Sequence, residues 1–158
     1  MKIAILTSKN QWFVPYAKKL RKKLQGSKLF FNHKKVDENY EIVFILSYDK
    51  IIEGKYLIKH KHNIVVHESA LPQGKGWAPL FWQILEGKNE IHFTMFEADN
   101  GIDDGNIYIQ KTFKFNGSEL NAELRKKQAN FTFDLCLDFV NNYSKYKVST
   151  KQSGKESF

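Results

Sequence analysis

Short apolar runs, separated by polar and glycine-containing segments, recur along the chain. The runs at residues 2–6, 28–31, 41–47 and 63–67 are apolar at most positions. Such continuous runs are typical of strands that are buried in a parallel sheet. The run at residues 91–98 is followed by the turn DNGIDDG and by the alternating run NIYIQKTFKF. This arrangement predicts a late antiparallel pair of strands.

Helical patterns lie between these strands. An apolar stripe at helical spacing predicts a helix over about residues 14–24, with lysines and an arginine on its other side. APLFWQILEG predicts a short helix that ends at Gly87, with Trp82 in the core. Ser118 is a suitable N-cap for a last helix that runs to about Asn142. The alternation predicts a three-layer α/β fold whose sheet is mostly parallel and has an antiparallel edge.

The length of 158 residues suits one domain. We expect this domain to cover residues 1–143, and residues 144–158, which are rich in Lys, Ser, Thr and Gly, to form a basic flexible tail. Thr7, Ser47 with Tyr48, and His67 each follow an apolar strand. The carboxyl ends of parallel strands share one edge, where such sheets bind ligands, so we expect these side chains to gather there.

Composition and charge narrow the function classes. A single cysteine excludes an internal disulfide and a thiol metal cluster, and we expect no metal site. The chain has neither a signal peptide nor a long apolar span, so we expect a cytoplasmic protein without a membrane partner. Although the net charge is +8, the lysines and arginines do not form a nucleic-acid motif, and we do not expect a nucleic-acid partner. The turn after the first strand, TSKN, has no glycine, which argues against a dinucleotide fingerprint.

Two residues are candidates for chemistry. His67 ends an apolar strand and opens a Pro/Gly loop, whereas His33, His60 and His62 lie among lysines and are expected at the surface. An imidazole can take or give a proton near neutral pH. A strand-end histidine bonded to a backbone carbonyl is the alternative interpretation. For Asp103, in IDDG, the alternative is a simple turn residue.

The stretch from His67 to Gln110 resembles the folate-dependent formyltransferase family. The shared pattern is His-x-Ser-x-Leu-Pro, a glycine before a Pro-led helix, and Asp-x-Gly-x-Ile followed by Gln. It corresponds here to His67, Ser69, Leu71, Pro72, Gly76, Pro79, Asp103, Gly105, Ile107 and Gln110. The resemblance implies a Rossmann-like formyltransferase fold and transfer of a formyl group from 10-formyltetrahydrofolate to an amine. Members of the family formylate methionyl-tRNA, glycinamide ribonucleotide and nucleotide-linked amino sugars.

The resemblance also implies roles for individual residues. His67 would donate to the developing oxyanion or accept the amine proton, and Asp103 would orient its ring. Residues expected to flank the folate are Ser47, Tyr48, Ile51 and Asp103. Residues expected to meet the acceptor are Ser69, Lys75, Gly76 and Trp77, with the lysine suited to a phosphate.

One position departs from the family. Val65 stands where the family usually has an asparagine, two residues before the histidine, and a valine cannot donate to an oxyanion. Losing one such donor costs on the order of a hundredfold in rate. Asn106 is the candidate replacement, and Ser69 is a second one.

The HESALPQGKGW variant most resembles enzymes of bacterial surface-sugar pathways, which implies an amino-sugar acceptor on a nucleotide or phosphate. A formyltetrahydrofolate hydrolase and a non-catalytic folate- or nucleotide-binding domain stay open as alternatives. A homodimer is compatible with the sequence.

Overall fold

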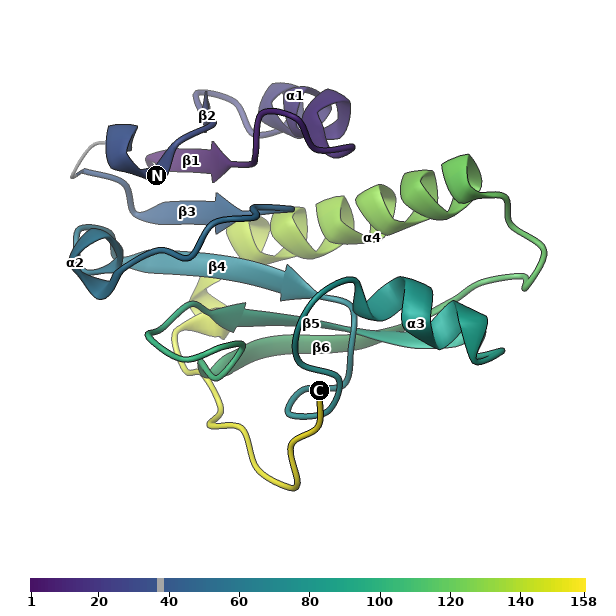
Figure 1. The fold of residues 1–158 in the computed structure, drawn as a ribbon. Coiled ribbons are helices and arrows are strands. Elements are labelled where there is room, and N and C mark those ends of the chain that lie inside the picture. Colours follow the sequence, from purple (N-terminus) through teal and green to yellow (C-terminus); the bar gives the residue numbers. More distant parts are fainter. Residues whose placement is uncertain (37–38) are drawn as a thin grey trace. The chain divides into compact units, whose positions relative to one another are not determined.

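The computed structural model describes residues 1–36 and 39–158, and hydrogen bonds order its strands β2-β1-β3-β4-β5-β6 in one sheet (Figure 1). β1 (Ile3–Leu6) runs parallel to β2 (Lys28–Phe30) and to β3 (Ile42–Ile45), and β3 runs parallel to β4 (His62–His67). β5 (Glu90–Glu97) and β6 (Ile107–Lys114) are antiparallel, with a bulge between Met95 and Phe96. The expected α/β fold, with a mostly parallel sheet and an antiparallel edge, is confirmed.

The chain divides into two compact units. The N-terminal unit comprises Met1–Val65 and Ala98–Asn100, and the C-terminal unit comprises Val66–Glu97 and Gly101–Phe158. The division therefore falls inside β4. The expected boundary at residue 143 stays a prediction. In the structure a 3-10 helix, η2, covers Tyr143–Tyr146, and Thr150 forms a two-residue antiparallel bridge with Ile107.

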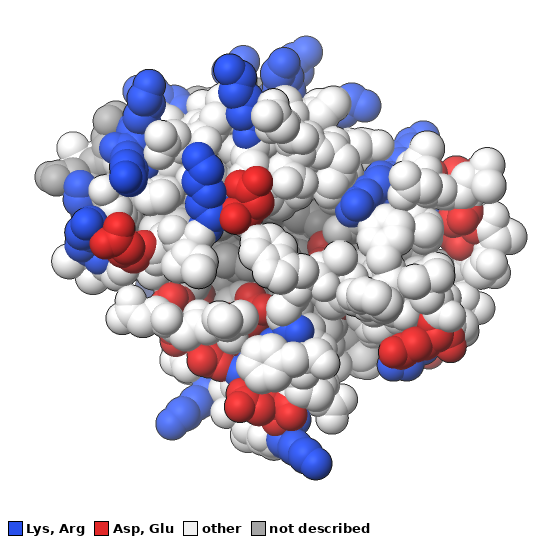
Figure 2. Space-filling view, in the orientation of Figure 1, with Lys and Arg blue, Asp and Glu red and all other residues white. Residues whose placement is uncertain are grey.

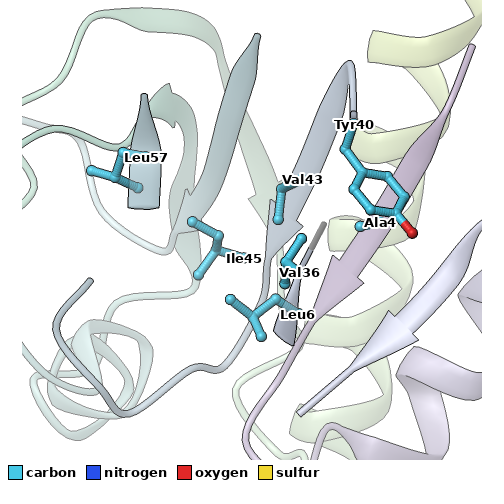
Figure 3. Close-up of a cluster of buried hydrophobic side chains, with 7 residues drawn as sticks. All are labelled: Ala4, Leu6, Val36, Tyr40, Val43, Ile45 and Leu57. Atoms are coloured by element: carbon cyan, nitrogen blue, oxygen red, sulfur yellow. The ribbon is translucent and has the colours of Figure 1, made fainter. Parts of the chain in front are cut away.

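The core of the N-terminal unit is a cluster of apolar side chains from the strands and from the segments around them (Figure 3): Ala4, Leu6, Val36, Tyr40, Val43, Ile45 and Leu57. Helix α1 (Val14–Lys23) has a proline in its first turn and buries Ala17 and Leu20, as the apolar stripe predicts. A short helix, α2 (Gly54–Leu57), and a 3-10 helix, η1 (His33–Lys35), complete the unit.

The C-terminal unit packs aromatic rings between its hairpin and a long helix, α4 (Asn121–Asn141). Phe113 of β6 stacks on Phe131 of α4 with ring centroids 4.1 Å apart. The predicted N-cap at Ser118 was wrong, because α4 begins three residues later. There the Glu123 carboxylate accepts the backbone N–H of Leu120 at 2.8 Å and satisfies one unpaired donor of the first turn.

Helix α3 (Pro79–Leu85) lies in the C-terminal unit and ends before Gly87, whose φ of 81° is left-handed, as the sequence predicts. Leu80 is its buried residue, whereas Trp82 exposes 64% of its surface. The prediction that Trp82 is a core residue was therefore wrong. A helix of two turns buries one narrow side, and the remaining apolar residues stay exposed.

Charged groups of both signs are interspersed on the face that Figure 2 presents, where the acidic side chains are red and the basic ones blue. Among residues 1–36 and 39–158, no helix is long and apolar enough to cross a membrane. The same residues contain no group of three or more His, Cys, Asp or Glu side chains that could hold a metal ion.

Candidate active site

His67 is the last residue of β4, and only 7% of its surface is exposed. Its Nε2 atom lies 2.7 Å from the carbonyl oxygen of Gly74 in the following loop. Because a carbonyl oxygen can only accept a hydrogen bond, Nε2 carries a proton in this arrangement. Nδ1 is then the nitrogen that can take up a further proton. The hydrogen bond to a backbone carbonyl that the sequence allows for a strand-end histidine is therefore present at His67. A carboxylate lies on the same side of the ring.

That carboxylate belongs to Asp103, in the loop between β5 and β6. Its backbone is left-handed, with φ 53°, a conformation that Asp tolerates better than most residues. The Oδ2 atom accepts the backbone N–H of Gly76 at 3.0 Å and lies 3.8 Å from His67 Nε2. At 3.8 Å the carboxylate acts on the ring as a nearby negative charge and not as a direct hydrogen-bond acceptor. The structure thus brings together the histidine and the aspartate of the motif.

Gly105 and Asn106 complete the Asp103 loop. A side-chain carbon at Gly105 would overlap the backbone carbonyl of Glu97, so the loop passes this strand only with glycine. The Asn106 side-chain amide donates to the hydroxyl of Ser149 at 3.2 Å. Its role as a replacement oxyanion donor stays a prediction.

Ser69 follows His67 in the loop after β4 and exposes 3% of its surface. Its carbonyl accepts the Thr94 hydroxyl at 2.6 Å, and the Gln110 amide in turn donates to that hydroxyl oxygen at 2.8 Å. The glutamine of the motif therefore tethers the start of the His67 loop to the hairpin. The Ser69 hydroxyl is buried, and it has no hydrogen-bond partner among the residues that the structure describes.

Lys75 lies in the same loop, but its side chain is only 3% exposed. Its ammonium is paired with the carboxylates of Asp104 and of Glu156, the latter at 2.8 Å. Hydrogen bonds to Asp104 and then to Glu156 hold the pKa of this ammonium above its ordinary value. Lys75 is therefore engaged within the C-terminal unit. By contrast, Trp77 exposes 74% of its surface.

Three of the residues expected to flank the folate, Ser47, Tyr48 and Ile51, lie in the N-terminal unit, whereas the fourth, Asp103, lies in the C-terminal unit. Ser47 lies two residues after the end of β3 and has a left-handed backbone, φ 50°, and its carbonyl accepts the Thr7 hydroxyl at 3.4 Å. The hydroxyl of Tyr48 lies 2.7 Å from Nδ1 of His33, and Ile51 exposes 86% of its surface. His33 is 9% exposed, so its expected surface position was wrong, and its burial lowers the pKa of the imidazole.

Sequence reasoning missed the contacts of residues 149–157 with the two loops. Gln152 donates to the carbonyls of Asp103 and Gly105, and Ser157 bonds with the loop at Gly74 and Lys75. These residues lie in a polar stretch without apolar periodicity, so no local pattern distinguishes them from a solvated tail.

Comparison with known proteins identifies the family of this chain. The family profile described as formyl transferase matches residues 9–135. A methionyl-tRNA formyltransferase of Caldicellulosiruptor saccharolyticus is 29% identical over 137 residues, which are 85% of this chain and 43% of that protein. The chain thus spans less than half the length of this relative.

Two solved structures have the same fold. A methionyl-tRNA formyltransferase from Clostridium thermocellum is 23% identical with a TM-score of 0.81, and the match covers 99% of this chain and 70% of that one. The formyltransferase PseJ from Anoxybacillus kamchatkensis is 20% identical with a TM-score of 0.68, covering 99% and 84%. Since the family profile matches most of the chain, this protein belongs to the formyl transferase family.

Proposed function

We propose that this protein transfers a formyl group from 10-formyltetrahydrofolate to the amine of an acceptor. The observation that carries the proposal is the placement of the buried His67 ring 3.8 Å from the Asp103 carboxylate, in the motif order of the family. The Gly76 amide holds the carboxylate from the other side at 3.0 Å. A fixed carboxylate beside an imidazole is an arrangement suited to moving one proton.

In this mechanism 10-formyltetrahydrofolate supplies the electrophilic formyl carbon. The acceptor nitrogen bonds to that carbon, the bond to the folate nitrogen breaks, and the proton lost by the amine passes to the folate nitrogen. His67 carries that proton between the two nitrogens through Nδ1, while Nε2–H stays on the Gly74 carbonyl. Asp103 stabilises the ring while it holds two protons. The negative charge that develops on the formyl oxygen requires fixed donors.

Within the N-terminal unit, Ser47, Tyr48 and Ile51 are the residues that we propose to contact the folate. Ile51 suits this role because its side chain is 86% exposed, in a segment without regular structure. Its apolar surface can pack against the flat ring system of the folate. The Tyr48 ring is held by His33, with ring centroids 5.8 Å apart in an edge-on arrangement. A ring held in one orientation costs little entropy when a ligand packs against it.

The acceptor that we propose is an amino sugar carried on a nucleotide or phosphate. Support comes from the HESALPQGKGW loop and from PseJ, whose solved complex contains a UDP-linked formamido sugar and tetrahydrofolate. Trp77, at 74% exposure, offers a ring face for a sugar or base to stack on. Ser69 and Gly76 would line the same acceptor site. Methionyl-tRNA is the competing acceptor, because the sequence relatives are methionyl-tRNA formyltransferases.

Val65 favours a second candidate function, a folate- or nucleotide-binding domain without turnover. A valine provides no donor to the oxyanion, and the loss of one donor costs on the order of a hundredfold in rate. This candidate predicts that folate binding survives His67→Ala and that no formylated product forms.

The experiment is a turnover assay with 10-formyltetrahydrofolate and a panel of nucleotide-linked amino sugars, with methionyl-tRNA as a further acceptor. Mass spectrometry follows the acceptor, absorbance follows the released folate, and a formate assay detects hydrolysis. His67→Ala is the inactive control, and His92→Ala, an exposed histidine on β5, is its matched control. A formylated sugar that disappears only in His67→Ala supports the proposal. Free formate without a formylated acceptor would mean a hydrolase, and bound folate without any turnover would reject transfer.

A further inference from the structure

Residues 149–157, here named the C-terminal strap, link the two loops that carry His67 and Asp103. At one end Thr150 and Ile107 exchange backbone hydrogen bonds of 2.7 and 2.8 Å. At the other end the Ser157 carbonyl accepts the Lys75 N–H at 2.9 Å, and the Ser157 hydroxyl accepts the Gly74 N–H at 3.0 Å. The strap is thus tied to both loops through backbone groups.

Gln152 lies between these two attachment points and is directed at the Asp103 loop. Its Nε2 atom donates to the carbonyl oxygen of Asp103 at 2.7 Å and to that of Gly105 at 2.9 Å. Two carbonyl oxygens can only accept, so the amide must present its NH₂ group and not its oxygen to them. Both hydrogens of that group are therefore used on the one loop.

These contacts bear on the reacting pair. Asp103 has a left-handed backbone, a conformation that costs free energy in a non-glycine residue, although less in Asp than in most, and that contacts on both sides of the residue stabilise here. Gln152 holds the Asp103 carbonyl on one side of the residue, and the Gly76 amide holds its carboxylate on the other. The carboxylate position relative to His67 therefore depends on a side chain that touches neither the ring nor the carboxylate.

We propose that Gln152 is a positioning residue for Asp103 in the formyl transfer. This inference rests on the proposed function. Without the two amide hydrogens, the loop from Asp103 to Gly105 loses the partners of two of its carbonyls, and the carboxylate moves away from the Gly76 N–H. A misplacement of about 1 Å in a catalytic group can cost on the order of a hundredfold in rate.

The test compares Gln152→Ala and Gln152→Met with two exposed neighbours in the strap, Lys151→Ala and Ser153→Ala. Gln152→Met keeps the bulk of the side chain and removes the amide, whose oxygen has no hydrogen-bond partner among the residues that the structure describes. In both Gln152 variants we expect kcat to fall roughly tenfold to a hundredfold while KM for the folate changes less than about twofold. The neighbour variants keep the wild-type kcat.

A second measurement does not require activity. The Gly76 amide proton reports on the Asp103 carboxylate, so its NMR signal should move upfield in Gln152→Ala and Gln152→Met, and hydrogen exchange at residues 104–107 should become faster. An unchanged Gly76 signal together with unchanged exchange overturns the positioning role. If wild-type protein shows no transfer to any acceptor, the proposed function fails, and the NMR result still decides whether Gln152 holds Asp103.

Discussion

Replacing Val65 by asparagine tests whether the missing oxyanion donor limits this protein. Side chains alternate along a strand, so positions 65 and 67 of β4 face the same side and lie roughly 6.6 Å apart along it. An asparagine there supplies an amide N–H on the His67 side. One oxyanion donor changes kcat by about 100- to 1,000-fold, so we expect Val65→Asn to raise kcat for formyl transfer by that order.

The same substitution costs stability. Val65 is partly buried and packs against the apolar cluster of the N-terminal unit. Since full burial of a valine contributes about 1.5–3 kcal/mol, we expect Val65→Asn to lose about 1–2 kcal/mol of unfolding free energy. For a chain of this size that is a Tm decrease of roughly 2–8 °C. The protein should therefore stay folded at assay temperature.

The assay measures single-turnover formylation with 10-formyltetrahydrofolate in wild type, Val65→Asn and Val65→Ala. Val66→Asn is the matched control, because its side chain faces the opposite side of β4. A double variant, Val65→Asn with His67→Ala, shows whether any gain depends on the histidine. If folded, folate-binding Val65→Asn gains less than about threefold over wild type, the oxyanion reasoning is refuted.

Three further outcomes are expected from the structure. Lys75→Met should lower the unfolding free energy, measured by urea titration, by about 1–3 kcal/mol. This value lies between those of exposed and buried ion pairs, because the lysine is buried while its two carboxylate partners are partly exposed. The control Lys88→Met, at an exposed ion pair, should change the unfolding free energy little. Gly105→Ala should lower both Tm and kcat, since the added carbon overlaps a backbone carbonyl, and unchanged values would contradict that close approach. Burial lowers the pKa of His60 below its ordinary value of 6.5, and the positive charge of Lys59 lowers it further. The folded state therefore favours the neutral ring, and the stability that is present above about pH 6.5 is lost as the pH falls and the ring must take up a proton. Tm measured from pH 7.5 to 5 should therefore fall less in His60→Leu than in wild type, and equal slopes would refute the assignment.

The sequence by itself determined most of the fold. Continuous apolar runs indicate the parallel strands, because a strand that is buried on both faces is apolar at successive positions. Alternation after a turn indicates the antiparallel hairpin, because a strand that is buried on one face is apolar at every second position. The resemblance to the formyltransferase family also implies the pairing of His67 with Asp103, which lie 3.8 Å apart in the structure. Local pattern was less reliable at element ends. Ser118 is a good N-cap by residue type, yet the N-cap position is Leu120, two residues later, and its N–H donates to the Glu123 carboxylate.

Only the tertiary structure decided which polar residues support the site. Gln152 contacts the carbonyl of a residue 49 positions earlier, and Glu156 pairs with a lysine 81 positions earlier. Contacts at such separations depend on where folding brings the chain, and a polar segment without periodicity carries no sign of them. For the same reason the sequence indicates a loop lysine at position 75 that suits a phosphate, although in the folded chain its ammonium is paired with two carboxylates. Local patterns report which face of an element is buried, whereas the partner of a buried charge is set by the fold.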